Sequence, residues 1–305
     1  MIIIGLVVVN FLKDIVIKTV ITSVGSNIVG APIKIGRFSL GLFTQKIRMF
    51  NFKLYNPKGF PHELMIDLPE VSVDYNSGAL LGGKLHCPFL AVDLKEMVVI
   101  RNKEGKLNVD SLKIIEEQKR NHKKSELMPI QIDVMKLNVD RVIFKDFSKG
   151  DQPNIQVFDV GLRDKTFRNI SSVPQMVTLI MAQAMSQTAI KSVGVYAAAS
   201  VLGVGFIPAG VVGALMGSDE ASAEFNKSFD RVFQTTLDFL KSRGEIKSED
   251  KATGLIKAKM QGTDLTIQVS DVEGKGSVTV SARQMLLPKP EVAAGIIYQL
   301  QQQLK

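Results

Sequence analysis

Apolar and polar residues alternate along most of the segment from residue 32 to about residue 100. Successive side chains of a β-strand point to opposite faces, so this period of two predicts strands with one buried face. Turn-forming residues separate the apolar runs, as at residues 76–78 and 82–83. Because the connections are short and hold few helical segments, we expect neighbouring strands to pair antiparallel in a meander.

A turn at residues 56–60 divides this segment. Pro57 fixes its own φ at about −65° and disfavours the helical region for the preceding Asn56. Gly59 supplies the conformational freedom that a tight reversal needs. Asn56, Pro57, Lys58, Gly59 and Phe60 are therefore predicted to form a β-turn between two strands.

Strand parity places six apolar residues on one face of the expected sheet. They are Val71, Val73 and Tyr75 on one strand and Leu90, Val92 and Leu94 on the next. An irregularity at residues 95–96 ends the second run. The opposite face of these strands is expected to be polar and to meet water.

More strands are expected over residues 130–162, which brings this first domain to roughly eight strands. Between the two groups of strands, residues 109–126 are rich in charge and hold few apolar residues. That pattern is typical of a solvent-exposed helix that ends in an exposed loop.

The N-terminus carries an apolar run over residues 2–12, which Lys13 interrupts. Such a run is shorter than the roughly 20 residues that cross a bilayer core. It lacks the preceding basic residue and the clean cleavage site of a signal peptide. Further apolar residues up to Val24 extend it into one long helix. We favour a membrane anchor, in which the helix enters the membrane at its start and lies amphipathically afterwards. The alternative is a buried helix.

Residues 169–217 form a second apolar segment, in which Lys191 is the one charged residue. The length of residues 193–217 permits a transmembrane helix, whereas their glycines and Pro208 disfavour one. Three interpretations stay open: helices packed over the mouth of the sheet or on the bilayer surface, true insertion, and a flexible linker.

Residues 218–305 predict a small α-β-β-β-α domain. A helix is expected from Ser218 or Asp219 to Gly244, with one apolar face. Three strands should follow at residues 255–260, 265–269 and 277–282, and then a final helix. The expected core residues are Phe225, Phe229, Val232, Phe233, Leu237 and Leu240 in the first helix and Val292, Ile296, Ile297, Leu300 and Leu304 in the last. This arrangement resembles small uncharacterised domains of bacterial lipoproteins.

Composition limits the possible partners. A chain of 305 residues with 45% apolar content predicts two folded domains with real cores. The net charge of +8 is scattered, and the absence of Trp, the four Tyr and the lack of a binding motif predict no nucleic-acid partner. Residues 1–60 hold eight Lys or Arg against one Asp, which favours attraction to anionic lipid headgroups.

No residues stand out as catalytic, metal-binding or cofactor-binding, so we expect neither an enzyme nor a cofactor. Cys87 is the one cysteine and cannot form an internal disulfide. Its neighbour His86 points to the other face of the strand, and neither His62 nor His122 has a ligand-spaced partner. Residues 203–208 and 248–251 match a dinucleotide fingerprint and a Ser-x-x-Lys motif only superficially.

Several weak motifs occur in series in the first half of the chain: residues 31–36, residues 45–55, the turn at 56–60, residues 71–75 and residues 101–112. In this order and spacing, residues 1–165 resemble the N-terminal region of the AsmA-like family of bacterial envelope proteins. The resemblance implies a single-pass anchor in the cytoplasmic (inner) membrane, with the main domains facing the periplasm. It also implies an antiparallel sheet that forms an apolar groove for phospholipid.

The resulting expectation is an α+β chain of four parts: an anchor helix at residues 1–30, an AsmA-like β domain at 31–168, an apolar Gly/Ala-rich helical segment at 169–217 and the C-terminal α+β domain at 218–305. The six face residues named above are the candidate groove lining. The expected function is binding or relay of phospholipid in support of outer-envelope biogenesis, with an envelope protein as a possible partner. The alternative is a scaffold or assembly factor of an envelope complex that carries no lipid.

Overall fold

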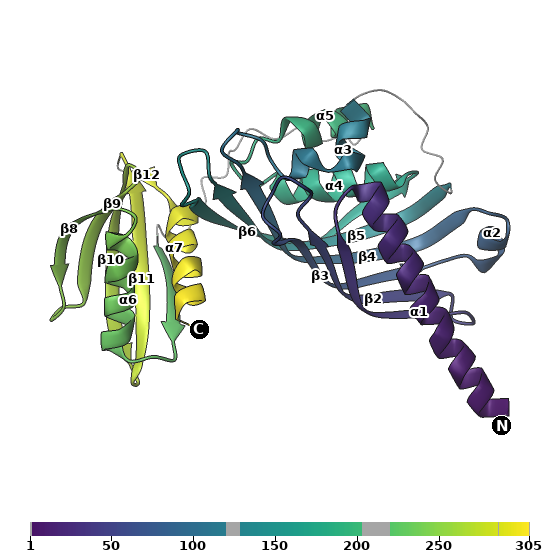
Figure 1. Ribbon diagram of the computed structural model, residues 1–305, viewed down its shortest axis with the longest axis horizontal. Coiled ribbons are helices and arrows are strands. Elements are labelled where there is room, and N and C mark those ends of the chain that lie inside the picture. Colours follow the sequence, from purple (N-terminus) through teal and green to yellow (C-terminus); the bar gives the residue numbers. More distant parts are fainter. Residues whose placement is uncertain (1, 120–128, 203–219, 286, 305) are drawn as a thin grey trace. The chain divides into compact units, whose positions relative to one another are not determined.

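The computed structural model describes residues 2–119, 129–202, 220–285 and 287–304. The chain has the expected α+β class, with helices and two sheets (Figure 1). It divides into two compact units. The first comprises Met1–Val142 and Asp159–Val211, and the second comprises Ile143–Phe158 and Val212–Lys305.

Within the described residues, the first sheet has six strands, which lie side by side in the order of the sequence. They are β1 (Ile33–Gly41), β2 (Lys46–Tyr55), β3 (Leu64–Asp74), β4 (Leu85–Arg101), β5 (Ile130–Asp146) and β6 (Asn154–Ile170). The pairs β1–β2, β2–β3 and β3–β4 are antiparallel, which confirms the predicted meander for these strands.

The prediction of roughly eight strands in this sheet is wrong, because β4, β5 and β6 each run unbroken for 17 residues. Their apolar residues change parity along the strand, and such a change suggests a break. An irregularity can turn the following side chains to the other face while hydrogen bonding to the neighbouring strand continues.

The same change of parity is visible in β1 and β2. Ile33 and Ile35 are buried at the start of β1, and Phe38 is buried further on. Gly36 stands between them, opposite Asn51 of β2, whose φ is 53°. A Cβ at Gly36 would lie 3.1 Å from the Cβ of Asn51, so a residue without a side chain eases the irregularity.

Helix α1 (Ile2–Val29) lies along β1 and runs in the opposite direction. Lys13 Nζ donates to the carbonyl of Leu40 at 2.6 Å, and Lys18 Nζ donates to that of Gly36 at 2.7 Å. Near the other end of the helix, Ser26 Oγ accepts from the amide of Ile33 at 2.9 Å. The predicted long N-terminal helix is therefore confirmed, and its residues from Lys13 onward pack on the sheet.

Shorter helices complete this unit: α2 (Ser77–Leu81), the 3-10 helix η1 (Val109–Ser111), α3 (Lys113–Lys119), α4 (Val173–Met185) and α5 (Val193–Val201). Helices α3, α4 and α5 pack together on one side of the sheet (Figure 1). The carboxylate of Asp110 in η1 accepts from Ser192 Oγ and, at 3.2 Å, from the amide of Val195, which ties η1 to the start of α5. Most of the predicted loop after residue 119 and most of the apolar residues 193–217 lie outside the described residues.

The second unit holds the other sheet and two long helices. Besides the end of β5 and the start of β6 within Ile143–Phe158, its elements are β7 (Glu220–Phe225), α6 (Phe229–Lys241), β8 (Glu245–Asp250), β9 (Leu255–Met260), β10 (Thr263–Val272), β11 (Lys275–Gln284), β12 (Leu287–Pro288) and α7 (Pro290–Gln303). The strand order is β12-β11-β10-β9-β8, with β7 also paired to β11. The three predicted strands and the final helix are confirmed.

The predicted start of the first C-terminal helix is wrong. Residues 220–225 form β7, and α6 begins at Phe229 after Ser228. The segment alternates Glu220, Ser222 and Glu224 with half-buried alanines, which suits a strand paired with β11. With β7, β8 and β12, the domain has more strands than the expected α-β-β-β-α arrangement.

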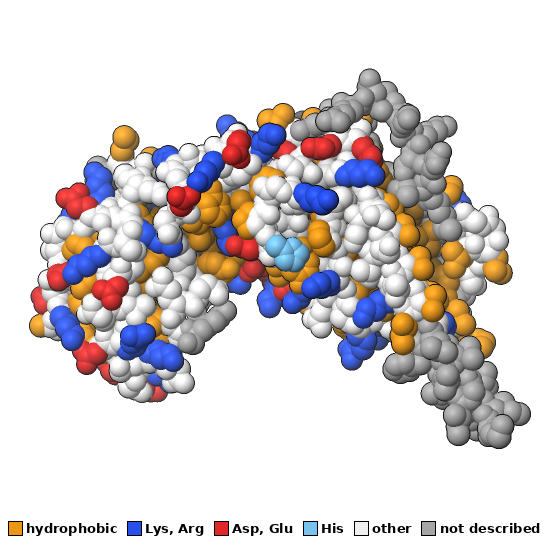
Figure 2. All heavy atoms as spheres, viewed as in Figure 1, with side chains coloured by type: hydrophobic (Ala, Val, Ile, Leu, Met, Phe, Trp, Pro, Cys, Tyr) orange, Lys and Arg blue, Asp and Glu red, His pale blue; other side chains and the backbone are white. Residues whose placement is uncertain are grey.

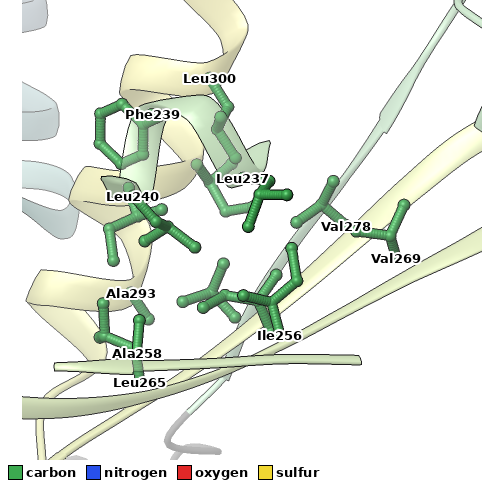
Figure 3. Close-up of a cluster of buried hydrophobic side chains, with 14 of the residues drawn as sticks. Leu237, Phe239, Leu240, Ile256, Ala258, Leu265, Val269, Val278, Ala293 and Leu300 are labelled. Carbon is green, nitrogen blue, oxygen red and sulfur yellow. The ribbon is translucent and has the colours of Figure 1, made fainter. Parts of the chain in front are cut away.

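The core of this unit lies between the two helices and the sheet (Figure 3). Val232, Phe233 and Leu237 of α6 and Ile296 and Leu300 of α7 are all buried there, as the helical spacing predicts. They meet alternate residues of β9, β10 and β11, among them Ile256, Ile267 and Val280. This layer of helices on an antiparallel sheet stabilises the unit through apolar burial.

Candidate functional site

The six predicted face residues lie together on β3 and β4. Val71 pairs with Val92 and Val73 with Leu90, so these side chains share one face of the sheet. The face continues onto β2, where Met49 is opposite Val71. The sequence parity therefore placed these residues correctly relative to one another.

These side chains are largely inaccessible to water. Val71, Tyr75, Leu90, Val92 and Leu94 are between 1% and 6% exposed. Val73 is half-buried. An acyl chain could contact most of this face only if the covering atoms moved aside, so a lipid groove at these residues stays a prediction.

The opposite face of the same strands is polar. Asp93 accepts from Asn138 Nδ2 at 2.6 Å, and Glu96 forms an ion pair with Arg141 at 2.6 Å. Both acidic residues are half-buried on β4. The first half of β4 thus has one apolar and one polar face, as its alternation indicates, whereas Met97–Ile100 are buried on both sides.

The predicted turn at residues 56–60 is present at the opposite end of β2 from the β1–β2 connection. The amide of Phe60 donates to the carbonyl of Pro57 at 3.3 Å, and Gly59 has a φ of 92°. Asn56 is buried. Its backbone amide donates a hydrogen bond to the carbonyl of Glu63 at 3.0 Å, and its side-chain Nδ2 donates one to the carbonyl of Pro61, also at 3.0 Å. Asn56 therefore stabilises the whole β2–β3 connection.

Asn56 also meets a buried residue that sequence reasoning did not single out. Asn108 Nδ2 donates to Asn56 Oδ1 at 2.7 Å and to the carbonyl of Val98 at 2.9 Å. Asn108 Oδ1 accepts from the amides of Ile100 and Val109, both at 2.9 Å. The two resemblance-bearing segments around Asn56 and Asn108 are thus joined by one buried network, and its polar groups are satisfied within the chain. These hydrogen bonds give the two amides a structural role.

A cleft of about 600 Å³ lies beside this turn. It is bounded by the end of α1, the β2–β3 connection and the start of α3. The ring of His62 stacks on Tyr55 at a centroid distance of 5.0 Å. The lining of the cleft combines apolar residues such as Ala31, Pro32 and Phe60 with polar ones, namely Ser26, Asn27, Asn56, Lys58, His62, Ser111, Lys113 and Glu116.

The titratable residues elsewhere on this sheet form no catalytic arrangement among the described residues. His86 Nε2 lies 2.8 Å from Asp133 Oδ2, and hydrogen bonds from His86 and Gln131 lower the pKa of that carboxyl. Burial, with a smaller contribution from Asp133, raises the pKa of the Cys87 thiol to about 11. Such a thiol is protonated at neutral pH and is a poor nucleophile. The described part of the chain brings no three His, Cys, Asp or Glu side chains together as a metal site.

Over residues 13–29, where the side chains of α1 are described, its exposed surface carries several apolar residues. Val16, Val20 and Val24 recur every fourth residue and are each about half exposed. Apolar residues also face the sheet, so the expected amphipathic pattern is absent from the part of α1 whose side chains are described. In the described regions, no helix combines the length and the hydropathy needed to cross a membrane.

No protein-family model matches this chain, and no curated protein matches it.

Proposed function

We propose that this protein is a membrane-anchored envelope protein of the AsmA-like type, held in the cytoplasmic membrane by its N-terminal segment with its main domains in the periplasm. Its apolar sheet face binds or relays phospholipid and so supports biogenesis of the outer envelope. The observation that carries this proposal is the fixed direction of α1 on β1, which sends the apolar residues 2–12 beyond one end of the sheet.

Residues 2–12 suit insertion into one leaflet of a membrane. At a helical rise of 1.5 Å per residue they extend for about 16 Å, roughly half of a hydrocarbon core of about 30 Å. The apolar side chains of Val16, Val20 and Val24 continue on the exposed side of α1. The excess of basic residues in residues 1–60 favours anionic headgroups nearby.

The size of the sheet limits what the protein can do alone. Six strands at a spacing of about 4.8 Å make the sheet roughly 30 Å wide, and strands of 17 residues at about 3.3 Å per residue make it roughly 55 Å long. Both dimensions are less than the depth of an envelope. Transport of lipid across an envelope therefore requires a protein partner.

A specific observation favours a second candidate function. The burial of Val71, Leu90, Val92 and Leu94 suits a closed core, and a closed core suits a membrane-bound scaffold or assembly factor that carries no lipid. The two functions differ in whether phospholipid occupies this face.

Native mass spectrometry of gently purified protein distinguishes the two functions. Lipid carriage predicts phospholipid on the wild type and its loss in Val73→Glu, because the half-buried site can hydrate a carboxylate that repels an acyl chain. Ser72→Glu is the matched control, since Ser72 is the half-buried neighbour that points to the polar face. A folded Val73→Glu variant that keeps its lipid would contradict lipid binding at this face, and an unfolded variant would indicate an ordinary core.

A further inference from the structure

Four large apolar side chains are exposed at the connections of the first sheet. Leu42 and Phe43 follow β1 in its turn to β2, and Leu80 and Leu81 lie in α2 between β3 and β4. Their exposed fractions are 56%, 101%, 39% and 92%. Apolar side chains that protrude so far into water call for an explanation when several lie together.

The two connections lie at the same end of the sheet. The strands are antiparallel, so the β1–β2 and β3–β4 connections emerge on the same side. The amide of Tyr75 donates to the carbonyl of Gln45 at 2.9 Å, and the amide of Ser77 donates to Gln45 Oε1 at 3.0 Å. The Tyr75 hydroxyl lies 3.3 Å from the carbonyl oxygen of Gly41. We call Leu42, Phe43, Leu80 and Leu81 the apolar edge.

Helix α1 points its N-terminus past the same end. The Asp14 carboxylate accepts from the amide of Leu40 at 3.0 Å, beside the bond from Lys13 Nζ to the Leu40 carbonyl. Lys18 bonds to Gly36, further from the turn, so the helix residues before Lys13 extend beyond the end of β1. Figure 1 shows the N-terminus and α2 toward one end of this unit, and Figure 2 shows hydrophobic side chains on the surface there.

We propose that the apolar edge is a second membrane contact, which enters the interfacial layer of the bilayer in which residues 2–12 are anchored. This inference rests on the anchoring part of the proposed function. Its occupant is the surface of a phospholipid bilayer that contains anionic lipids. The carrying observation is that the apolar edge and the apolar N-terminal run of α1 leave the sheet at the same end.

The shape and the charge of this end favour a bilayer over a protein partner. Phe43 and Leu81 protrude from two separate short connections, and a bilayer interface accepts such side chains without a complementary pocket. Exposed Lys84 follows the second connection, three residues after Leu81, and donates to Gln131 Oε1 at 2.8 Å. Exposed Lys46 follows the first, three residues after Phe43, and forms an ion pair with Asp74 at 3.3 Å. They lie at the base of the apolar edge, where headgroup phosphates would meet them.

Two contacts constrain the sheet more than one helix does. With both in place, the β1–β2 and β3–β4 connections face the membrane and the strands extend away from it. Tyr75, at the end of β3, then lies at the membrane end of the buried apolar face. A lipid that leaves the bilayer would meet this face at its nearest end.

The chain has no Trp, so one introduced Trp reports on its own surroundings. The test uses full-length Phe43→Trp and, as control, Met285→Trp, since Met285 is 90% exposed in the other unit. Each is mixed with vesicles of phosphatidylcholine and phosphatidylglycerol, with or without brominated acyl chains. We expect a blue shift and bromine quenching of the emission for Trp at position 43 and neither for Trp at position 285.

Vesicle flotation separates the failure of this inference from failure of the anchor. Phe43→Ser combined with Leu81→Ser should lower vesicle affinity by about a hundredfold or more, the effect expected from losing the burial of two side chains of this size. Protein that floats while Trp at position 43 stays water-exposed would overturn the inference and leave the anchor intact. Wild-type protein that does not float would overturn the anchor itself. A blue shift without vesicles would indicate self-association in place of membrane contact, and it would also overturn the inference.

Discussion

At the scale of single residues, the buried amides of Asn56 and Asn108 are the polar centre of the first unit. They join residues that are 52 positions apart in the sequence. Buried amides contribute to stability mainly because leaving their partners unpaired costs free energy. The motif around the turn at residues 56–60 is therefore explained by folding, whatever the protein binds.

Replacing Asn108 by Ala should destabilise the first unit by about 2–4 kcal/mol, because the Ile100 amide, the Val98 carbonyl and Asn56 Oδ1 lose their partner in a buried place. Urea unfolding of the full chain measures this change. Asn102→Ala is the control, since Asn102 Oδ1 accepts from the Lys106 amide in an exposed turn. An effect of Asn108→Ala no larger than that of the control would show that the network matters little.

Cys87 should resist thiol reagents in the folded protein. Burial raises its thiol pKa to about 11, and the thiolate is the reactive form. At pH 8 we expect very slow reaction with a maleimide, faster reaction as the pH rises toward 11, and fast reaction at pH 8 once the chain is unfolded in guanidinium chloride. Rapid labelling of the native protein at pH 8 would contradict the burial of this residue.

At the scale of elements, the proposed function assigns different roles to the two halves of α1. Its residues from Lys13 to Val29 pack along β1 and bond to Leu40, Gly36 and Ile33. The bonds of Lys13 and Asp14 to Leu40, next to the last residue of β1, direct the helix before them beyond that end of the strand. A deletion of residues 1–30 would remove both halves, so a shorter deletion separates anchoring from folding.

Deletion of residues 2–12 should move the protein from the membrane fraction to the soluble fraction. The bonds of Lys13 and Asp14 to Leu40 remain, so the circular dichroism spectrum should change only by the lost helical residues. Cell fractionation followed by detection of the protein in each fraction measures the outcome. If the shortened and folded protein still pellets with membranes, the main membrane contact lies elsewhere, and residues 173–217 become the next candidate.

At the scale of the whole molecule, the two units have separate apolar cores. The buried cluster of the second unit draws all of its members from residues 225–304. We therefore expect an excised fragment of residues 218–305 to unfold cooperatively, although a domain of fewer than about 100 residues is only marginally stable.

Phe233→Ala should cost about 3–5 kcal/mol in this fragment, because Phe233 is 3% exposed within the cluster. Phe229→Ala should cost less, since the Phe229 ring is only partly buried and stacks on Phe233 at 5.8 Å. Thermal unfolding of the two variants gives the comparison. Equal effects would contradict the difference in burial, and a fragment without a cooperative transition would contradict its independence.

The amino-acid sequence by itself determined those strands, turns and helix faces that can be recognised from residues close together in the chain. The alternation in residues 32–100, the turn at Asn56-Pro57 and the apolar stripe of α7 all follow from neighbouring residues, because strand period, proline geometry and helical spacing are local properties. The common face of Val71, Val73, Leu90 and Val92 was predictable for the same reason.

Only the tertiary structure decided the features that depend on distant partners. Residues 220–225 form a strand because β11 lies beside them, and β4 continues through its change of parity because its neighbour continues to bond. The pairing of Asn56 with Asn108, the burial of Leu94 and the full exposure of Phe43 depend on what packs nearby. The sequence does not show whether a given apolar residue is buried or exposed. Its burial depends on which distant segments of the chain pack against it in the folded structure.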